Sequence, residues 1–151
     1  MITRESPLGA DLALLMQRHT ADMHAQTPPE SIHMMDAGQL AIPEVAFYVL
    51  REGGIPVAMG AFKHIAPGHG EIKSMHVLAE HRGQGHSRAM LVHLMDEAKA
   101  AGLQRLSLET GAEPIFTPAR ALYARAGFDY CDPIEGYALD PNSVFMTKVL
   151  A

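Results

Sequence analysis

Hydrophobic and polar positions along the chain change period several times, and these changes mark the expected elements. Stretches rich in β-branched and aromatic residues, bounded by Gly or Pro turns, have the pattern of strands. They cover residues 2–5, 45–51, 57–65, 71–77, 105–109, 128–131 and 144–150. Short turns at 52–54 and 67–70 join three of these strands, so this part of the chain is expected to form an antiparallel meander.

Between the strands, apolar residues recur at the spacing of amphipathic helices. The spacing predicts helices over 10–24, over 85–101 and from Thr117 to about residue 126. A shorter helix is expected over 31–40, with Pro43 as its stop. The resulting order is β-α-α-β-β-β-α-β-α-β-β, which predicts an α+β or mixed α/β fold. A chain of this length is expected to form a single domain over residues 1–151.

Length, charge and cysteine content narrow the class of protein. The formal charge is −5, so the basic surface that nonspecific nucleic-acid or membrane binding needs is not expected. Cys131 is the single cysteine, which excludes an intrachain disulfide and suits a reducing compartment. The first residues include Arg4 and Glu5 and no apolar run, unlike a signal peptide. We therefore expect a cytoplasmic protein without a nucleic-acid or membrane partner.

The chain from Arg82 to Ser87 has the composition of an anion-binding turn between a strand and a helix. Gly83 and Gly85 lack a Cβ atom, so the backbone there can bend tightly and approach a ligand. The first N–H groups of the following helix have no intrahelical partner, and with the helix dipole they favour a diphosphate. The simpler interpretation is a glycine turn that merely starts a helix, and two glycines alone leave both open.

Two other phosphate motifs fit this turn less well. A dinucleotide-binding Rossmann turn would have a third glycine where Arg88 stands, and hairpins would not join the strands that precede it. A Walker P-loop would need Gly-Lys-Ser/Thr, which this segment does not contain.

Two segments of the chain, in the same order as in the family, resemble motifs of the GNAT superfamily of N-acetyltransferases. Arg82-x-x-Gly85-x-Ser87 resembles that family's Arg/Gln-x-x-Gly-x-Gly/Ala motif, and residues 119–128 resemble its fourth helix and the strand after it. The element order agrees over nearly the whole chain. Segments 70–75, 108–111 and 142–147 further resemble a subgroup of small bacterial members. This resemblance implies a central, mostly antiparallel, twisted sheet of about six to seven strands flanked by about four helices.

The resemblance also implies an acyltransferase that uses acetyl-CoA as co-substrate and needs no metal. In the family the fourth and fifth strands splay apart, and pantetheine lies in the gap. The residues implied to hold the coenzyme are Met75, His76, Val77, Arg82, Gly83, Gln84, Gly85, His86, Ser87 and Arg88. The sequence departs from the family at Ser87, which replaces the usual Gly or Ala, and at Phe116, where many members carry an asparagine that contacts the coenzyme.

The same resemblance suggests an acid and a base for amine attack on a thioester. Tyr123 aligns with the family's frequent fourth-helix tyrosine, which protonates the departing sulfur; its place on the apolar stripe also fits a core aromatic. Glu71, four residues before Met75, aligns with the catalytic glutamate of the family's histone acetyltransferases. The alternative for Glu71 is a strand charge paired with Lys73.

A regular strand would place Glu71, Lys73 and Met75 on one side. Glu109 and His76 are the other candidate bases, because Glu109 ends the neighbouring strand and histidine titrates near neutral pH.

The acceptor site is implied by resemblance to lie near residues 27–40, where Ser31 and His33 are expected to contact substrate, together with Glu109. The implied acceptor is a primary amine of a small molecule or an amino-acid-like compound. A protein or peptide amine and a non-catalytic acyl-CoA-binding module are the alternatives, and a homodimer is expected by analogy with other small domains.

Nine histidines raise the question of a metal site. The pairs His19/His24 and His81/His86 are five residues apart, which is not the i, i+4 spacing of a helical zinc site. No metal site is therefore expected.

Overall fold

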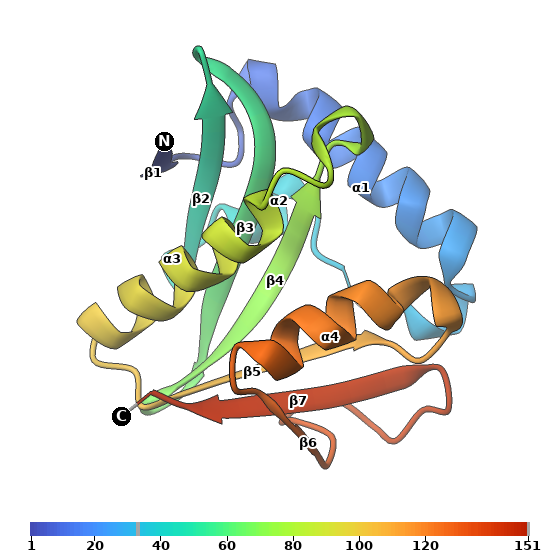
Figure 1. The fold of residues 1–151 in the computed structure, drawn as a ribbon. Coiled ribbons are helices and arrows are strands. Elements are labelled where there is room, and N and C mark those ends of the chain that lie inside the picture. Colours follow the sequence, from blue (N-terminus) through green and yellow to red (C-terminus); the bar gives the residue numbers. More distant parts are fainter. Residues whose placement is uncertain (33, 151) are drawn as a thin grey trace.

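The chain forms a seven-stranded sheet in the order β1-β2-β3-β4-β5-β7-β6 (Figure 1). A computed structural model describes residues 1–32 and 34–150. The strands are β1 (Ile2–Arg4), β2 (Val45–Glu52), β3 (Ile55–Ala66), β4 (His69–Val77), β5 (Arg105–Gly111), β6 (Asp129–Cys131) and β7 (Ser143–Val149). The helices are α1 (Ala13–Gln26), α2 (Ala37–Leu40), α3 (His86–Ala100) and α4 (Thr117–Arg125), with short 3-10 turns η1 (Ala10–Leu12), η2 (Pro29–Ser31), η3 (Ala79–His81) and η4 (Pro114–Phe116).

The predicted fold class is confirmed. Every paired neighbour in the described sheet is antiparallel except β4 and β5, which run parallel. The meander β2-β3-β4 forms as the Gly-containing turns predicted. No helix in residues 1–32 and 34–150 has both the length and the apolar character that a bilayer crossing requires.

The expected helix over 31–40 is the main difference. Within the described residues of that stretch, α2 occupies only Ala37–Leu40. Asp36 starts it through a capping box: its carboxylate accepts from the Gln39 N–H at 2.7 Å, and the Gln39 side chain accepts from the Asp36 N–H at 2.9 Å. Pro29 instead sits at the start of the 3-10 turn η2. The cap therefore places the start of the helix several residues later than the apolar pattern suggested.

Helices cover both faces of the sheet and create two cores. On β2, Ala46, Tyr48 and Leu50 pack in the core beneath α3 and α4. The intervening Val45, Phe47 and Val49 pack in a second core with residues of η1, α1 and α2. Because successive side chains of a strand point to opposite faces, burial on both sides makes β2 almost continuously apolar.

Strands β4 and β5 separate soon after they begin. They pair only at His69–Arg105, Gly70–Leu106 and Glu71–Ser107 among the described residues, although β4 continues to Val77 and β5 to Gly111. Figure 1 shows the two strands diverging, with α1 and α4 on either side of the opening. The backbone groups along this opening are thus not used in a β4–β5 ladder.

A β-bulge lies in the diverging part of β4. The register with β3 shifts between Met59 and Ala61, so Ser74 and Met75 together face Gly60. Ser74 takes a left-handed φ of 56°, which is uncommon for a residue with a Cβ atom. The condition of a regular strand, under which Glu71, Lys73 and Met75 would share one side, therefore holds only as far as Lys73, and the bulge re-aims the strand where it borders the opening.

Candidate functional site

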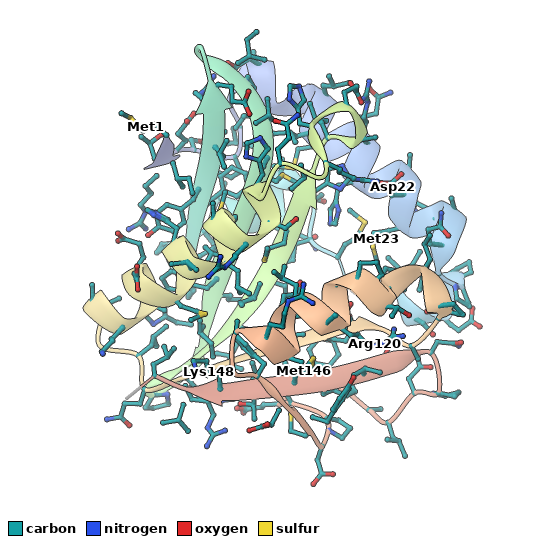
Figure 2. The ribbon with its side chains drawn as sticks, in the orientation of Figure 1. Met1, Asp22, Met23, Arg120, Met146 and Lys148 are labelled. Atoms are coloured by element: carbon teal, nitrogen blue, oxygen red, sulfur yellow. The ribbon has the colours of Figure 1, made fainter. Side chains whose placement is uncertain are left out.

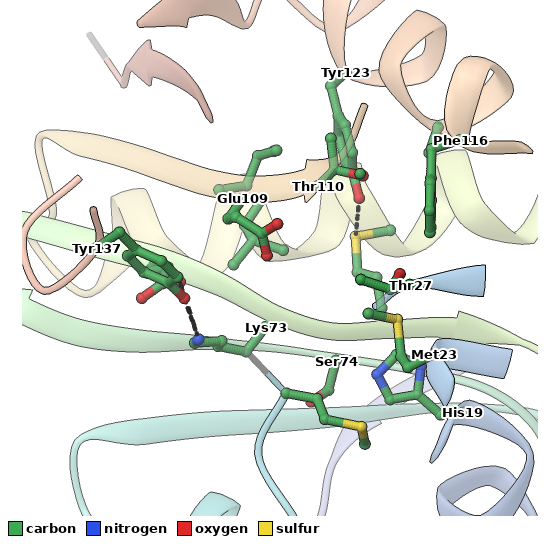
Figure 3. Close-up of a pocket in the computed structure, with 17 residues that line it drawn as sticks. His19, Met23, Thr27, Lys73, Ser74, Glu109, Thr110, Phe116, Tyr123 and Tyr137 are labelled. Carbon is green, nitrogen blue, oxygen red and sulfur yellow. Dashed lines mark hydrogen bonds and ion pairs between the residues drawn. The ribbon is translucent and has the colours of Figure 1, made fainter. Parts of the chain in front are cut away.

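A pocket fills the opening between β4 and β5 (Figure 3). Its walls come from residues 71–75 of β4, 108–111 of β5, α1 and α4, together with Tyr137 from the loop between β6 and β7. Met23 of α1 points into the space between the two helices (Figure 2) and lines this pocket. The structure thus brings together Glu71, Met75, Glu109 and Tyr123, four of the residues that the sequence singled out.

Glu71 forms a compact network with Lys73 and Tyr137. The Tyr137 hydroxyl donates to Glu71 Oε2 at 2.5 Å, and Lys73 Nζ lies 3.0 Å from the same oxygen. Lys73 Nζ also donates to the Tyr137 hydroxyl at 2.6 Å. Glu71 is only 4% exposed, so these contacts compensate a carboxylate that would otherwise be costly to bury. The anticipated pairing with Lys73 is present, and Glu71 faces the pocket as well.

Tyr137 was not predicted from the sequence as a site residue. It lies in the loop between β6 and β7, where its ring packs against Phe145 with centroids 5.5 Å apart. Burial, and then the hydrogen bond to Glu71, raise the pKa of its phenol, so it is a proton donor at neutral pH. A loop tyrosine far along the chain carries no sequence signal that links it to β4.

Glu109 projects into the pocket between Tyr137 and Tyr123 (Figure 3). Burial raises the pKa of this carboxyl to about 7; the Ser143 side chain and the charge of Lys73 oppose the effect, and the negative charges of Glu71 and Asp140 add to it. A carboxylate with this pKa is partly protonated at neutral pH and can exchange a proton there. Glu109 therefore has the titration behaviour that a general base requires.

Tyr123 belongs both to the core and to the pocket. It is 8% exposed, and its ring packs edge-on against Phe128. Its hydroxyl reaches the pocket and lies 4.0 Å from the sulfur of Met75. Burial raises the pKa of the phenol to about 12. The two interpretations of Tyr123 are therefore compatible, because a core ring carries a protonated hydroxyl at the pocket wall.

Phe116 forms an apolar wall beside Tyr123 (Figure 3). Its ring lies so close to Gly111 that a Cβ atom there would come within 2.1 Å of it. Arg120 holds the same segment by donating to the carbonyl of Gly111 at 2.6 Å. The residue that departs from the family pattern thus packs against the end of β5.

Two histidines meet at the edge of the site. The rings of His19 on α1 and His76 on β4 pack edge-on with centroids 5.2 Å apart. Burial lowers the pKa of both, that of His19 to about 4. His76 Nε2 is buried and has no hydrogen-bond partner among the described residues. His19, rather than His76, lines the pocket.

The predicted anion-binding turn has the expected backbone. Gly83 and Gly85 have φ of 78° and 83°, and α3 begins at His86 without a side-chain cap. No atom lies within 4 Å of a Cβ built at either glycine, so the left-handed conformation, not crowding, requires glycine there. Residues 82–88 are exposed apart from the half-buried His86, which leaves the turn accessible to a ligand.

Arg82 anchors this turn to the rest of the molecule. Its Nε donates to the carbonyl of Val77 at 3.0 Å, and its guanidinium lies 3.1 Å from the carboxylate of Asp22 on α1. The side chain therefore holds the turn against the end of β4. The Val77 carbonyl, expected to face the coenzyme, already accepts this bond.

Ser31 is a buried link between two loops. It is 1% exposed and donates to Asp140 at 2.6 Å, while Asn142 donates to it at 3.4 Å. It lies outside the set of residues that line the pocket, so its contacts join η2 to the loop before β7. His33, the other expected contact on this side, lies outside the described residues.

Comparisons with known proteins agree with this geometry. The model of the acetyltransferase (GNAT) family matches residues 14–128. YsnE of Bacillus subtilis, an uncharacterized N-acetyltransferase, is 44% identical over 94% of both chains. An IAA acetyltransferase of Azospirillum brasilense is 40% identical over 99% of this chain and 97% of its own. The crystal structure of a protein named as an acyl-CoA N-acyltransferase from Klebsiella pneumoniae superimposes with a TM-score of 0.81 at 29% identity, covering 100% of this chain and 97% of the other.

The family match covers most of the chain, and these relatives extend over nearly its full length. The seven-stranded sheet, the split between β4 and β5 and the turn before α3 are consistent with it. The chain therefore belongs to the GNAT family of acetyltransferases and is an acyltransferase.

Proposed function

We propose that this enzyme transfers an acetyl group from acetyl-CoA to a primary amine of a small or amino-acid-like acceptor by direct attack. The observation that carries the proposal is the split between β4 and β5, which leads from the pocket towards the turn before α3. A flat, extended molecule with a diphosphate at one end and a reactive thioester at the other matches this arrangement.

Backbone groups of Met75, His76 and Val77, beside the bulge, are proposed to bind the pantetheine amides. The diphosphate is proposed to lie on the turn of residues 82–88, whose N–H groups begin α3. Each bond from a backbone N–H to a charged oxygen contributes about 1.5–3 kcal/mol, so several of them hold an anion firmly. Acetyl-CoA supplies an activated acyl group, and the remaining chemistry falls to the pocket residues.

Two carboxylates can accept the proton of the attacking amine. Glu71 aligns with a family base, but its Oε2 already accepts from Tyr137 and pairs with Lys73. Glu109 has a pKa near neutrality and projects into the same pocket. These observations support Glu109 as the base, directly or through a water molecule, with Glu71 positioning Lys73 and Tyr137.

Tyr123 is proposed as the acid. As the N–C bond forms and the C–S bond breaks, the amine proton passes to Glu109, and the Tyr123 hydroxyl donates a proton to the departing sulfur. The pKa of about 12 keeps this phenol protonated through the working range. Tyr123 then regains a proton from solvent or from the carboxyl that accepted one.

The acceptor is proposed to enter on the side of the pocket that Glu71, Glu109 and Tyr137 line. The negative charges of Glu71 and Asp140 act on Glu109 and make this side of the pocket negative, and Lys73 offsets part of the charge. A protonated amine is attracted to such a site before it loses its proton.

Thiol release from acetyl-CoA, followed with a panel of amines and with IAA, tests the proposal. IAA is included because one relative is named for it. We expect amine-dependent turnover and competition by coenzyme A but not by NAD or ATP. The proposal would be contradicted if none of the acceptors in the panel supported turnover, or if NAD or ATP bound more tightly than coenzyme A.

A further inference from the structure

Three potential metal ligands meet beside the anion-binding turn. Glu52 ends β2, His81 ends η3, and His86 is the first residue of α3. One donor atom from each lies within 4.8 Å of the other two. We call these three residues the loop-flank cluster. The two histidines come together because the chain turns back between them through Arg82–Gly85, a geometry that a helical spacing rule does not cover.

The donor atoms of the cluster lie close enough together for small side-chain rotations to form a zinc site. His86 Nε2 and Glu52 Oε1 are 2.5 Å apart, yet the ring nitrogen makes no aligned hydrogen bond within the described part of the chain. In a tetrahedral site with bonds of about 2.0–2.1 Å, neighbouring ligand atoms lie about 3.3 Å apart. A cation between the side chains would separate the closest pair and draw in the more distant ligand by small rotations.

We propose that the loop-flank cluster binds a zinc ion. Two imidazoles and one carboxylate are the donors of three-ligand zinc sites, which keep a fourth position for water or substrate. Both histidines are half-buried and Glu52 is exposed, so an ion can enter from solvent. This departs from the expectation of no metal, because that expectation considered spacing along the chain and not the contribution of the β2–β3 hairpin.

The ion would clamp the anion-binding turn. His81 and His86 flank Arg82–Gly85, the glycine-containing part of this turn, and Glu52 belongs to a different part of the fold. Fixing both ends of the turn reduces the conformational entropy that the turn loses when it binds a diphosphate. The positive charge of the ion also attracts the diphosphate. Zinc and coenzyme A should therefore bind with positive coupling. This second step rests on the proposed function, whereas zinc binding itself does not.

The binding test uses the full chain without a histidine tag. Zinc is titrated against a chromogenic chelator, and cobalt is added in its place to reveal tetrahedral absorption bands. We expect one equivalent to bind, and we expect Glu52→Gln and His81→Gln each to weaken binding by at least about tenfold. His24→Gln, which removes an exposed histidine of α1, is the matched control and should bind like the unaltered chain.

Absence of a stoichiometric ion in the unaltered chain would overturn the site. Equal affinity in the unaltered chain and in Glu52→Gln and His81→Gln would do so too, since other histidines would then hold the metal. Circular dichroism checks that each variant folds. Because Glu52 is exposed, Glu52→Gln should fold and can test the site even if His81→Gln does not fold.

Calorimetry with coenzyme A tests the coupling. One equivalent of zinc should tighten coenzyme A binding about fivefold in the unaltered chain, and not in His81→Gln. If zinc binds but the affinity for coenzyme A is unchanged, the clamp is refuted and the metal site stands. If coenzyme A binds under neither condition, the proposed function fails while the chelator titration still decides the zinc site.

Discussion

The hydroxyl of Tyr137 donates a 2.5 Å hydrogen bond to Glu71 across 66 residues of sequence. This contact joins the loop between β6 and β7 to the last residue of β4 that pairs with β5, and Lys73 completes the network. A buried carboxylate thereby gains two partners at the base of the pocket, and the loop gains a fixed position over it. The acceptor side of the site depends on that contact.

Replacing Tyr137 by Phe should lower both stability and acceptor affinity. Glu71 would keep Lys73 but lose a donor, which costs about 1–3 kcal/mol for a buried charged group. We expect a smaller free energy of unfolding in urea and a higher KM for the amine, with the KM for acetyl-CoA little changed. Tyr130→Phe is the control, because Tyr130 is 64% exposed; equal losses in both variants would show that the contact has no special role.

Glu109→Gln should reduce kcat by about 10²–10⁴-fold, the usual contribution of a general base. In the unaltered enzyme the rate should rise with pH through about 7, since the carboxyl of Glu109 must lose its proton to act. The variant should lose this limb of the pH profile. The control is Glu135→Gln, at an exposed position, which should keep the pH profile of the unaltered enzyme. If Glu71→Gln abolishes the limb and Glu109→Gln keeps it, Glu71 is the base.

Tyr123→Phe should lower kcat by about 100-fold while coenzyme A binds normally. The lost hydroxyl has one weak contact, 4.0 Å from the Met75 sulfur, so the free energy of unfolding should change little. Stopped-flow measurement of thiol release, together with calorimetry for coenzyme A, separates these effects. A variant with full kcat would remove Tyr123 from the chemistry and leave it as a core aromatic.

Gly85→Ala should weaken coenzyme A binding and destabilise the fold by about 1–2 kcal/mol, because residue 85 has a φ of 83°. Gly102→Ala is a close match at the other end of α3. Its φ is 88°, and no atom lies within 4 Å of a Cβ there either. We expect similar destabilisation in both variants but weaker binding only in the first. Weaker binding in both would point to a general effect of strain.

His19→Gln should make the protein less sensitive to acid. Burial lowers the pKa of His19 from 6.5 to about 4 in the folded state, so the unfolded chain binds more protons between these values. Stability therefore rises with pH across this window, and His19 contributes at most about 3 kcal/mol to the change. Urea unfolding at pH 4 and pH 7 measures it. His24→Gln should keep the full pH dependence of the free energy of unfolding. If His19→Gln keeps it too, the pKa of His19 is not lowered in the folded state.

Local sequence signals account for most of the elements. The turns at residues 52–54 and 67–70 close hairpins, and the apolar stripe of α3 lies within the predicted span. These features depend on contacts between near neighbours, which alternation and turn chemistry report directly. The stretch over 31–40 differs because a single capping residue, Asp36, decides where its helix begins. Apolar spacing carries no information about that choice.

Part of the site could also be predicted, since the glycines before α3 and the position of Tyr123 are encoded in contiguous motifs. Glu109 was a candidate base from its place at the end of a strand, but the shift of its pKa could not be predicted, because it depends on burial and on the charges of Glu71 and Asp140. Tyr137 and the loop-flank cluster were missed for a related reason. Their partners come from separate elements, whose distances no spacing rule contains.

By itself, then, the sequence determined the order of strands and helices, the hairpins and the turn at the start of α3, because each follows from the conformational preferences of neighbouring residues. Only the tertiary structure decided that β4 and β5 pair at three positions and then separate, and which side chains face one another across the gap. Electrostatic interactions and desolvation act through space, so the chemistry of this pocket is set by packing between distant segments.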